Sequence, residues 1–238
     1  MGRAAAPHAL AAEAQGVRRP RGDQLDKSEF AERLDLVQTQ FSGVLRPLGF
    51  RRSGRTYNRT TPGGLVQVIN LQISRPDPVP PQLASLREAG RHDKFTVNLG
   101  VWVPEVSKYH GMEPRSKTIQ DYDSHVRARL GQFATPPSDL WWALDEAWPA
   151  CTAKALALLQ AGGLPFLERM GTRDGIVAEW LGRAPDSRIV VAIIEARRGR
   201  PDIARHLLAA QIASTRMTNH HAYVRVVAKQ LELGELPP

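Results

Sequence analysis

Apolar residues first recur at the spacing of a helix. The positions that share this helical face are Phe30, Leu34, Val37, Phe41 and Val44. Asp26 followed by Glu29 resembles a capping box just before them. We therefore predict an amphipathic helix that stops near Pro47, with Gly49 free to take a left-handed conformation before the chain becomes extended.

The pattern then changes to strict alternation of apolar and polar positions, which predicts β-strands. The alternating segments cover residues 68–73, 95–103 and 122–130. We expect the first two to pair with each other, although the proline-rich stretch 75–93 separates them as a long surface loop. The Trp141-Trp142 pair is expected to begin or end a short extended piece.

Beyond Asp145 the spacing is helical throughout, and it predicts about five short helices. The glycines that we interpret as helix ends are Gly162, Gly163, Gly171, Gly182, Gly199 and Gly234. The residues that we interpret as N-caps are Asp145, Thr172, Ser187 and Asn219.

These patterns predict an α+β fold, with an N-terminal amphipathic helix packed on an antiparallel sheet of about four strands. An all-helical C-terminal half follows. We expect residues 1–24 to form a disordered N-terminal extension, residues 25–145 to form the sheet domain and residues 146–238 to form a helical region packed on that domain.

The polar sides of the predicted strands hold the strongest candidate site. If the strands pair antiparallel, one face of the sheet collects Asn70, Gln72, Thr96, Asn98, His125, Arg127 and Arg129. Amides and guanidinium groups match the geometry of carboxylates and phosphates, so this face could bind an anion. The alternative is that these residues form the solvated side of an antiparallel sheet, where polar residues are expected.

A basic cluster lies earlier in the chain, which carries a net charge of +8. Its members are Arg51, Arg52, Arg55 and Arg59. With Tyr57 among them, these residues combine charge that attracts phosphate with one ring that could stack on a base. A solvated hairpin whose arginine stems cover apolar surface explains the cluster equally well. Because the positive charge is spread along the whole chain, nucleic-acid binding is an alternative that we do not favour.

Cysteine usage and hydropathy bear on the compartment. The single cysteine, Cys151, cannot form an internal disulfide, and residues 1–24 contain no apolar core of a signal peptide. The longest uninterrupted apolar run, Ile189–Ile194, is far shorter than the roughly 20 residues that cross a bilayer. We therefore expect a cytoplasmic protein with no membrane association.

Signatures of catalysis, cofactors or metals do not emerge from the sequence. Asp121, Asp123 and His125 would share one face of a strand, but residues four apart on a strand lie about 13 Å from each other, too far to share one ion. We predict no catalytic residue, no metal and no cofactor. The favoured role is a non-catalytic binding module for an acidic protein or an anionic small molecule. The alternative is a phosphodiester-acting hydrolase that uses Asp123, His125 and an arginine, or a nucleic-acid-binding protein.

Several short segments, taken in order, resemble the bacterial domain of unknown function 4304 (DUF4304) family. These segments are Leu48–Arg55, Val68–Gln72, Phe95–Gly100, Arg127–Gly131 and Trp141-Trp142. The likeness covers roughly residues 28–145. It supports the predicted boundaries of the sheet domain and implies no activity.

Overall fold

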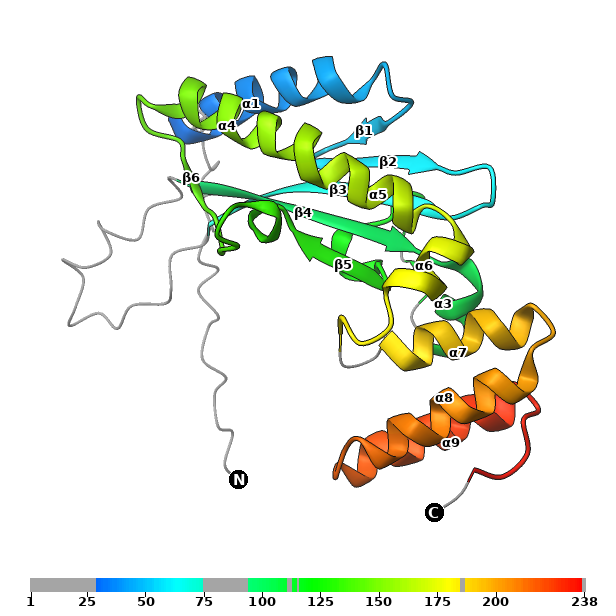
Figure 1. Cartoon of the computed structure of the whole chain (residues 1–238). Coiled ribbons are helices and arrows are strands. Elements are labelled where there is room, and N and C mark those ends of the chain that lie inside the picture. The colour runs from blue at the N-terminus through cyan, green and yellow to red at the C-terminus, as the bar shows by residue number, and fades with distance from the viewer. Residues whose placement is uncertain (1–28, 75–93, 111–112, 115, 185–186, 237–238) are drawn as a thin grey trace, which may run out of the picture.

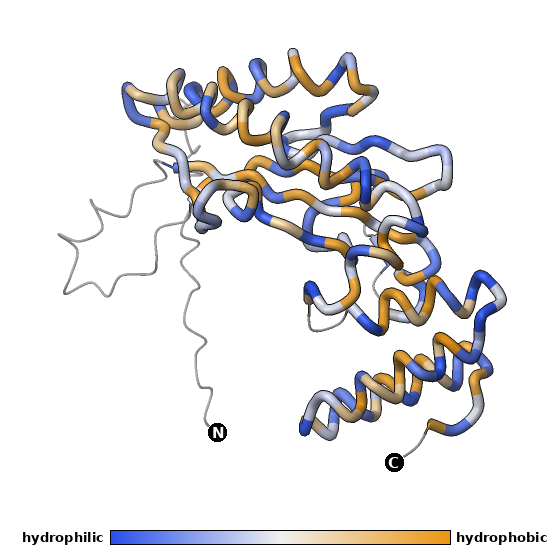
Figure 2. Tube along the Cα trace, in the orientation of Figure 1, coloured by the Kyte–Doolittle hydropathy of each residue, from blue (hydrophilic) through white to orange (hydrophobic). Residues whose placement is uncertain are grey.

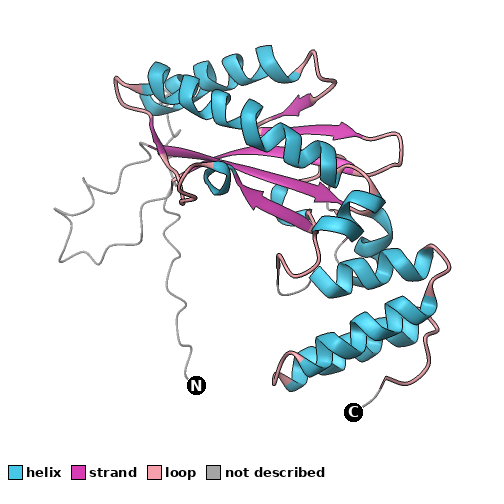
Figure 3. Ribbon diagram, in the orientation of Figure 1, coloured by secondary structure: helices cyan, strands magenta, loops and turns pink. Residues whose placement is uncertain are grey.

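The computed structural model describes residues 29–74, 94–110, 113–114, 116–184 and 187–236. Within these residues, strands occur only in the first part of the chain, and helices alone follow (Figure 3). The first part comprises α1 (Glu29–Leu45), β1 (Arg51–Ser53), β2 (Thr56–Thr60), β3 (Val66–Ile73), β4 (Lys94–Trp102), α3 (Pro104–His110), η2 (Asp121–Asp123), β5 (Val126–Arg129), η3 (Leu130–Phe133) and β6 (Trp142–Ala143). The second part comprises α4 (Trp148–Leu158), η4 (Leu159–Gly163), α5 (Leu164–Met170), α6 (Arg173–Glu179), α7 (Ser187–Arg197), α8 (Pro201–Ala213) and α9 (Thr218–Gln230).

The strands form one antiparallel sheet in the order β1-β2-β3-β4-β5, and β6 also pairs with β4. This confirms the predicted α+β class, the antiparallel sheet and the helical second half. The number of about four strands was too low, because six are present in the described part of the chain. The two shortest strands, β1 with three residues and β6 with two, are too short to produce a readable alternation.

The predicted strand at residues 122–130 was too long. Only Val126–Arg129 of this segment forms a strand, and the 3-10 turns η2 and η3 lie on either side of it. Asp123 explains the first turn, because its Oδ2 accepts a hydrogen bond from the backbone nitrogen of Gln120 at 2.9 Å. A short acidic side chain that bonds to nearby backbone in this way competes with strand formation.

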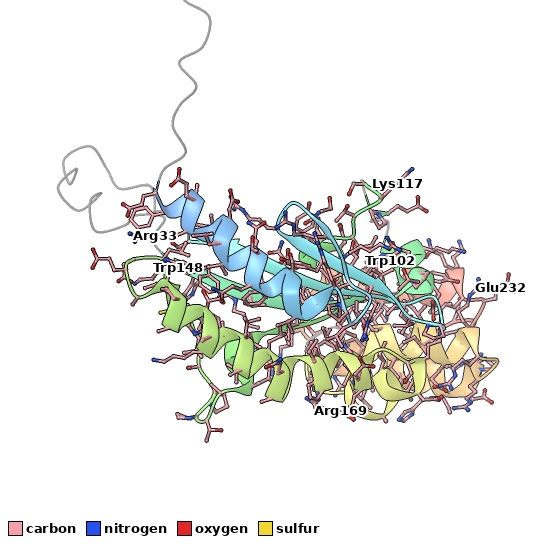
Figure 4. The ribbon with its side chains drawn as sticks, turned by 90° about the horizontal axis from the view of Figure 1, so that it is seen from above. Arg33, Trp102, Lys117, Trp148, Arg169 and Glu232 are labelled. Atoms are coloured by element: carbon pink, nitrogen blue, oxygen red, sulfur yellow. The ribbon has the colours of Figure 1, made fainter. Side chains whose placement is uncertain are left out.

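One face of the sheet is covered by α1 and by the α4–α5 helix (Figure 1). Hydrophobic residues, orange in Figure 2, recur along these helices and along the strands, and the buried ones belong to one cluster. Seen from above, α1 and α4 lie side by side, with Arg33 and Trp148 at the same end (Figure 4). Arg33 Nη1 donates to the carbonyl oxygen of Leu144 at 3.0 Å, which ties α1 to the segment just before α4.

The α4–α5 helix continues through Gly162 and Gly163, where we had predicted a helix end. These residues lie in the π-helical turn η4. A Cβ atom on Gly162 would lie 2.5 Å from Phe133 Cβ, and one on Gly163 would lie 3.1 Å from Leu99 Cδ1. The two glycines therefore let the helix approach the sheet closely, which is a second use of glycine besides ending helices.

The combined helix Trp148–Met170 is long and apolar enough, by length and composition alone, to cross a membrane. Helices in the core of soluble proteins meet the same criterion. Leu159, Phe166 and Leu167 of this helix belong to the buried cluster that it shares with the sheet. The expected absence of membrane association stays a prediction.

The C-terminal helices α7, α8 and α9 stack beside the sheet and its covering helices (Figure 1). Six α-helices follow Asp145 in the described residues, against about five predicted. The end of α7 is held by Glu195, a buried acid that accepts from Arg198 Nη1 at 3.3 Å and Arg200 Nη1 at 3.1 Å.

Three predictions concern residues outside the described ranges. They are the capping by Asp26, the loop 75–93 and the disorder of residues 1–24.

Candidate functional site

The strand register places the polar residues singled out from the sequence on one face of the sheet. Asn98 in β4 lies directly opposite Asn70 in β3 and opposite Arg129 in β5. Gln72 lies two residues after Asn70, and Arg127 lies two residues before Arg129. Residues that pair directly, or that are two apart on one strand, point to the same face. These five residues therefore share the face that α1 and α4 leave uncovered.

The amides on this face are largely engaged in holding the protein together. Asn98 Nδ2 donates to Gln72 Oε1 at 2.8 Å and to Asp121 Oδ2 at 3.0 Å. Asn70 Nδ2 donates to Thr56 Oγ1 at 2.9 Å, and that hydroxyl donates to Gln120 Oε1 at 2.7 Å. The chain around η2 thus packs over part of the sheet and is held there by the amides. Beside it, Gln72, Asn98, Arg127 and Arg129 line a second cavity of about 540 Å³.

Arg129 is also engaged. Its Nη1 donates to both carboxylate oxygens of Asp139, at 2.6 and 2.8 Å, and its guanidinium lies 5.4 Å from the ring centre of Trp141. The hydrogen bond from Arg129 lowers the pKa of Asp139 below its ordinary value. Trp141 therefore has a local partner, and Asp139 occupies the Nη1 atom of Arg129.

Arg127 differs from its neighbour. Its side chain is 56% exposed, and its nearest acid is Asp121, whose Oδ2 lies 3.7 Å from Nη2. That distance is beyond a hydrogen bond. The donors of Arg127 therefore remain available at the edge strand β5.

Arg127 lines a cavity of about 560 Å³ between the edge of the sheet, the helices α5 and α7, and residues 180–184, which follow α6. The sheet side of the cavity is formed by Tyr122, Asp123, Ser124, His125, Arg127, Ala128, Gln132 and Phe133. The helical side is formed by Phe166, Trp180, Arg183, Ala184, Ser187 and Val190. We call this cavity the β5 cleft. Its volume is in the range of sites for small molecules.

A second arginine reaches the β5 cleft from the helical side. The side chain of Arg183 is 50% exposed, and its Nη2 lies 3.7 Å from Glu179 Oε2, so this ion pair is as loose as that of Arg127. Asp123 is the only acid among the described residues that line the cleft, and its Oδ2 already accepts from Gln120. The lining therefore holds two arginines and one acid, and each arginine has a further acid, Asp121 or Glu179, 3.7 Å away.

His125, on the lining of the cleft, is tied to Val103 through one ring nitrogen. The backbone nitrogen of Val103 donates to His125 Nδ1 at 3.0 Å, so this ring nitrogen must be unprotonated. A neutral imidazole held in this way carries its proton on Nε2. The Nδ1 atom of His125 is therefore occupied by Val103 and does not suit proton abstraction.

Aromatic rings provide the apolar part of the cleft. Phe133 and Phe166 pack with their ring centres 5.3 Å apart, and Trp180 is nearly buried beside them. The indole nitrogen of Trp180 is buried without a hydrogen-bond partner among the described residues. By contrast, the ring of Tyr122 is 67% exposed. The cleft thus combines a buried aromatic wall, one exposed ring and two loosely paired arginines.

The basic cluster seen in the sequence is divided by the fold. Arg51 is exposed on β1, whereas Arg52 Nη1 donates to Gln38 Oε1 at 3.2 Å. Arg59 donates to Gln67 Oε1 at 2.6 Å and forms an ion pair with Glu168. Arg55 is exposed in the turn between β1 and β2.

Tyr57 cannot stack on a base. Its ring is fully buried, and its hydroxyl donates to the carbonyl oxygen of Gln38 at 2.8 Å. This burial raises the pKa of Tyr57 above its ordinary value. The combination of charge and an accessible ring that suggested nucleic-acid binding is therefore absent at this cluster in the described residues.

Sequence reasoning missed Tyr122 and Arg183 as members of a site. A signal for Tyr122 was present, because an aromatic residue between two aspartates is poorly placed for a core strand. No comparable signal marks Arg183, which comes from a distant helical segment. In the described part of the chain, no group of three or more His, Cys, Asp or Glu side chains could hold a metal ion.

The family model for the domain of unknown function DUF4304 matches residues 41–77 and 84–169. No curated protein and no solved structure matches the chain. The sheet side of the β5 cleft and Phe166 lie inside the matched residues, whereas Trp180, Arg183 and Val190 lie beyond them. The cleft is therefore composed of the family domain and of the helices that follow it.

Proposed function

The chain belongs to the DUF4304 family, and we propose that it is a non-catalytic binding protein that holds an anionic ligand in the β5 cleft. The observation that carries this proposal is the pair Arg127 and Arg183. Both side chains are at least half exposed, both line the same cavity, and the acid nearest to each lies 3.7 Å away. Guanidinium groups without a tight partner bind carboxylate or phosphate with charge-assisted hydrogen bonds.

The shape of the site favours a small ligand over an acidic protein. Protein interfaces of standard size bury about 800 Å² on each partner and are centred on well-packed anchors. The cationic groups described above instead surround a cavity of about 560 Å³. A compact anion can contact both sides of such a cavity at once.

The test measures binding of inorganic pyrophosphate to the full chain by isothermal titration calorimetry. Hydrogen bonds that involve a charged group contribute about 1.5–3 kcal/mol, so Arg127→Gln or Arg183→Gln should weaken binding by about 10- to 100-fold. Arg51→Gln is the matched control, because Arg51 is exposed on the opposite edge of the sheet. Equal affinity of the double variant and the unmodified protein would overturn the proposal.

A phosphodiester hydrolase is the second candidate, because Asp123, His125 and Arg127 all line the β5 cleft. Two contacts speak against it. The Nδ1 atom of His125 accepts from Val103, and the Oδ2 atom of Asp123 accepts from Gln120, so neither group is free to act as a base at these atoms. Hydrolysis of bis(p-nitrophenyl) phosphate that His125→Gln abolishes, with the fold intact by circular dichroism, would favour the hydrolase.

A further inference from the structure

The β5 cleft offers more than positive charge, because one aromatic ring on its lining is held outward. Tyr122 occupies the centre of η2, and its side chain is 67% exposed. A tyrosine ring so placed leaves both apolar area and ring face in contact with water. Among large hydrophobic side chains of the described residues, few are as exposed.

The turn that carries Tyr122 is fixed on both sides. Asp121 accepts from Asn98 Nδ2 in the middle of the sheet, at 3.0 Å. Asp123 accepts from the backbone nitrogen of Gln120 at 2.9 Å, and Gln120 itself accepts from Thr56 at 2.7 Å. The exposed ring is therefore mounted on a rigid part of the protein, which reduces the entropy that a ligand loses by stacking on it.

The cleft next to Tyr122 also has groups that can contact the edge of a polar ring. Gln132 is exposed, lines the cleft and carries both a donor and an acceptor. Phe133 and Phe166 also line the cleft, where their paired rings form an apolar wall.

We infer that the anionic ligand of the β5 cleft is a nucleoside monophosphate or a molecule of the same chemistry, in which a planar heterocycle is joined to a phosphate. The ring stacks on Tyr122 and meets the polar group of Gln132, while the phosphate takes the donors of Arg127 and Arg183. This inference rests on the proposed function, because it names the class of ligand that the same site binds. It adds that the ligand must carry a planar heterocycle besides its anionic group.

When an aromatic side chain that stacks on a base is replaced by alanine, the affinity for the nucleic acid typically falls by about 10-fold or more. The experiment titrates the full chain with the four common ribonucleoside monophosphates, with ribose 5-phosphate and with inorganic pyrophosphate. We expect at least one nucleoside monophosphate to bind about 10-fold more tightly than ribose 5-phosphate. Tyr122→Ala should remove most of that difference and leave ribose 5-phosphate binding unchanged, whereas Tyr122→Phe should retain the difference.

Met217→Ala is the matched control, because Met217 is 69% exposed and does not line the β5 cleft. Equal binding of ribose 5-phosphate and all four nucleoside monophosphates would overturn the inference and leave the proposed anion site intact. If Tyr122→Ala weakens the binding of ribose 5-phosphate and of the nucleoside monophosphates by the same factor, the inference is also overturned. It is likewise overturned if a tyrosine-containing acidic peptide binds more tightly than any nucleotide. If no phosphate-bearing probe binds at all, the proposed function fails together with the inference.

Discussion

Arg173 joins three segments that are far apart in the sequence, and its removal gives the sharpest test of how the helical half is attached. Its Nε and Nη2 donate to the two carboxylate oxygens of Glu105 in α3, at 2.5 and 2.8 Å. Its Nη1 donates to the carbonyl oxygen of Gly63 at 2.7 Å. The hydrogen bonds with Glu105 raise the pKa of Arg173, so the guanidinium stays charged.

The expected effect follows from burial. The side chain of Glu105 is 13% exposed and that of Arg173 is 31% exposed, so the pair is partly shielded from water. Arg173→Met leaves the Glu105 carboxylate without its bidentate partner and Gly63 without a donor. Removing one partner of a fully buried pair destabilises by about 3–5 kcal/mol, and an exposed pair contributes about 0–1 kcal/mol. For this intermediate case we expect a loss of about 2 kcal/mol.

The assay is equilibrium unfolding of the full chain in urea, followed by circular dichroism. Arg169→Met is the matched control, because Arg169 pairs with Glu179 at 3.0 Å but its side chain is 47% exposed. The control should change the free energy of unfolding by less than about 0.5 kcal/mol. If Arg173→Met and Arg169→Met have equal effects, the reasoning from burial is wrong.

Two further predictions concern single residues of the sheet and its surroundings. In β4, Gly100→Ala should destabilise the protein by about 1–3 kcal/mol, because the new Cβ would lie 2.3 Å from Ser124 Oγ. In α1, Gly43→Ala should stabilise it by about 0.5–1 kcal/mol, because nothing lies within 4 Å of the new Cβ. Urea unfolding of both variants checks these signs. The hydrogen bond from Arg129 lowers the pKa of Asp139 in the folded protein. The contribution of Asp139 to stability is therefore fully present above its unfolded pKa of about 3.9, and it is lost as the pH falls through the lower pKa of the folded protein. Unfolding measured from pH 6 to pH 2 should therefore show a shallower acid loss in Asp139→Asn, and identical profiles would contradict the assignment.

The sheet could be predicted from sequence where two strands alternate over their full lengths. Eight residues of β3 pair with β4 in a register that puts Ile69 opposite Leu99 and Asn70 opposite Asn98, as the two alternating patterns require. The pattern fails near Asp123 because the turn there is closed by a side-chain contact with Gln120. Alternation in the sequence does not show that a side chain, here that of Asp123, accepts a hydrogen bond from a backbone nitrogen and closes a turn.

The candidate site was only partly accessible to sequence reasoning, for a related reason. Polar residues that share a sheet face follow from strand pairing, so Asn98 and Arg127 could be placed together. Whether each of them is free depends on distant partners, and Asn98 turns out to hold Asp121 and Gln72. The helical side of the cleft, with Arg183, requires knowledge of how the second half of the chain folds back on β5.

The net charge of +8 gives little information about ligand binding, because several arginines of the described residues already pair with acids. Arg59 and Arg173 each bind an acid and also donate through their other guanidinium nitrogens, so few of their donors are left for a ligand. Arg127 and Arg183 have acids nearby at 3.7 Å, close enough to hold the guanidinium in place and too far to occupy its donors. Such loosely paired arginines are oriented before a ligand arrives and can exchange a weak ion pair for a strong one. That difference in pairing, more than the total charge, supports our proposal that the β5 cleft binds an anion.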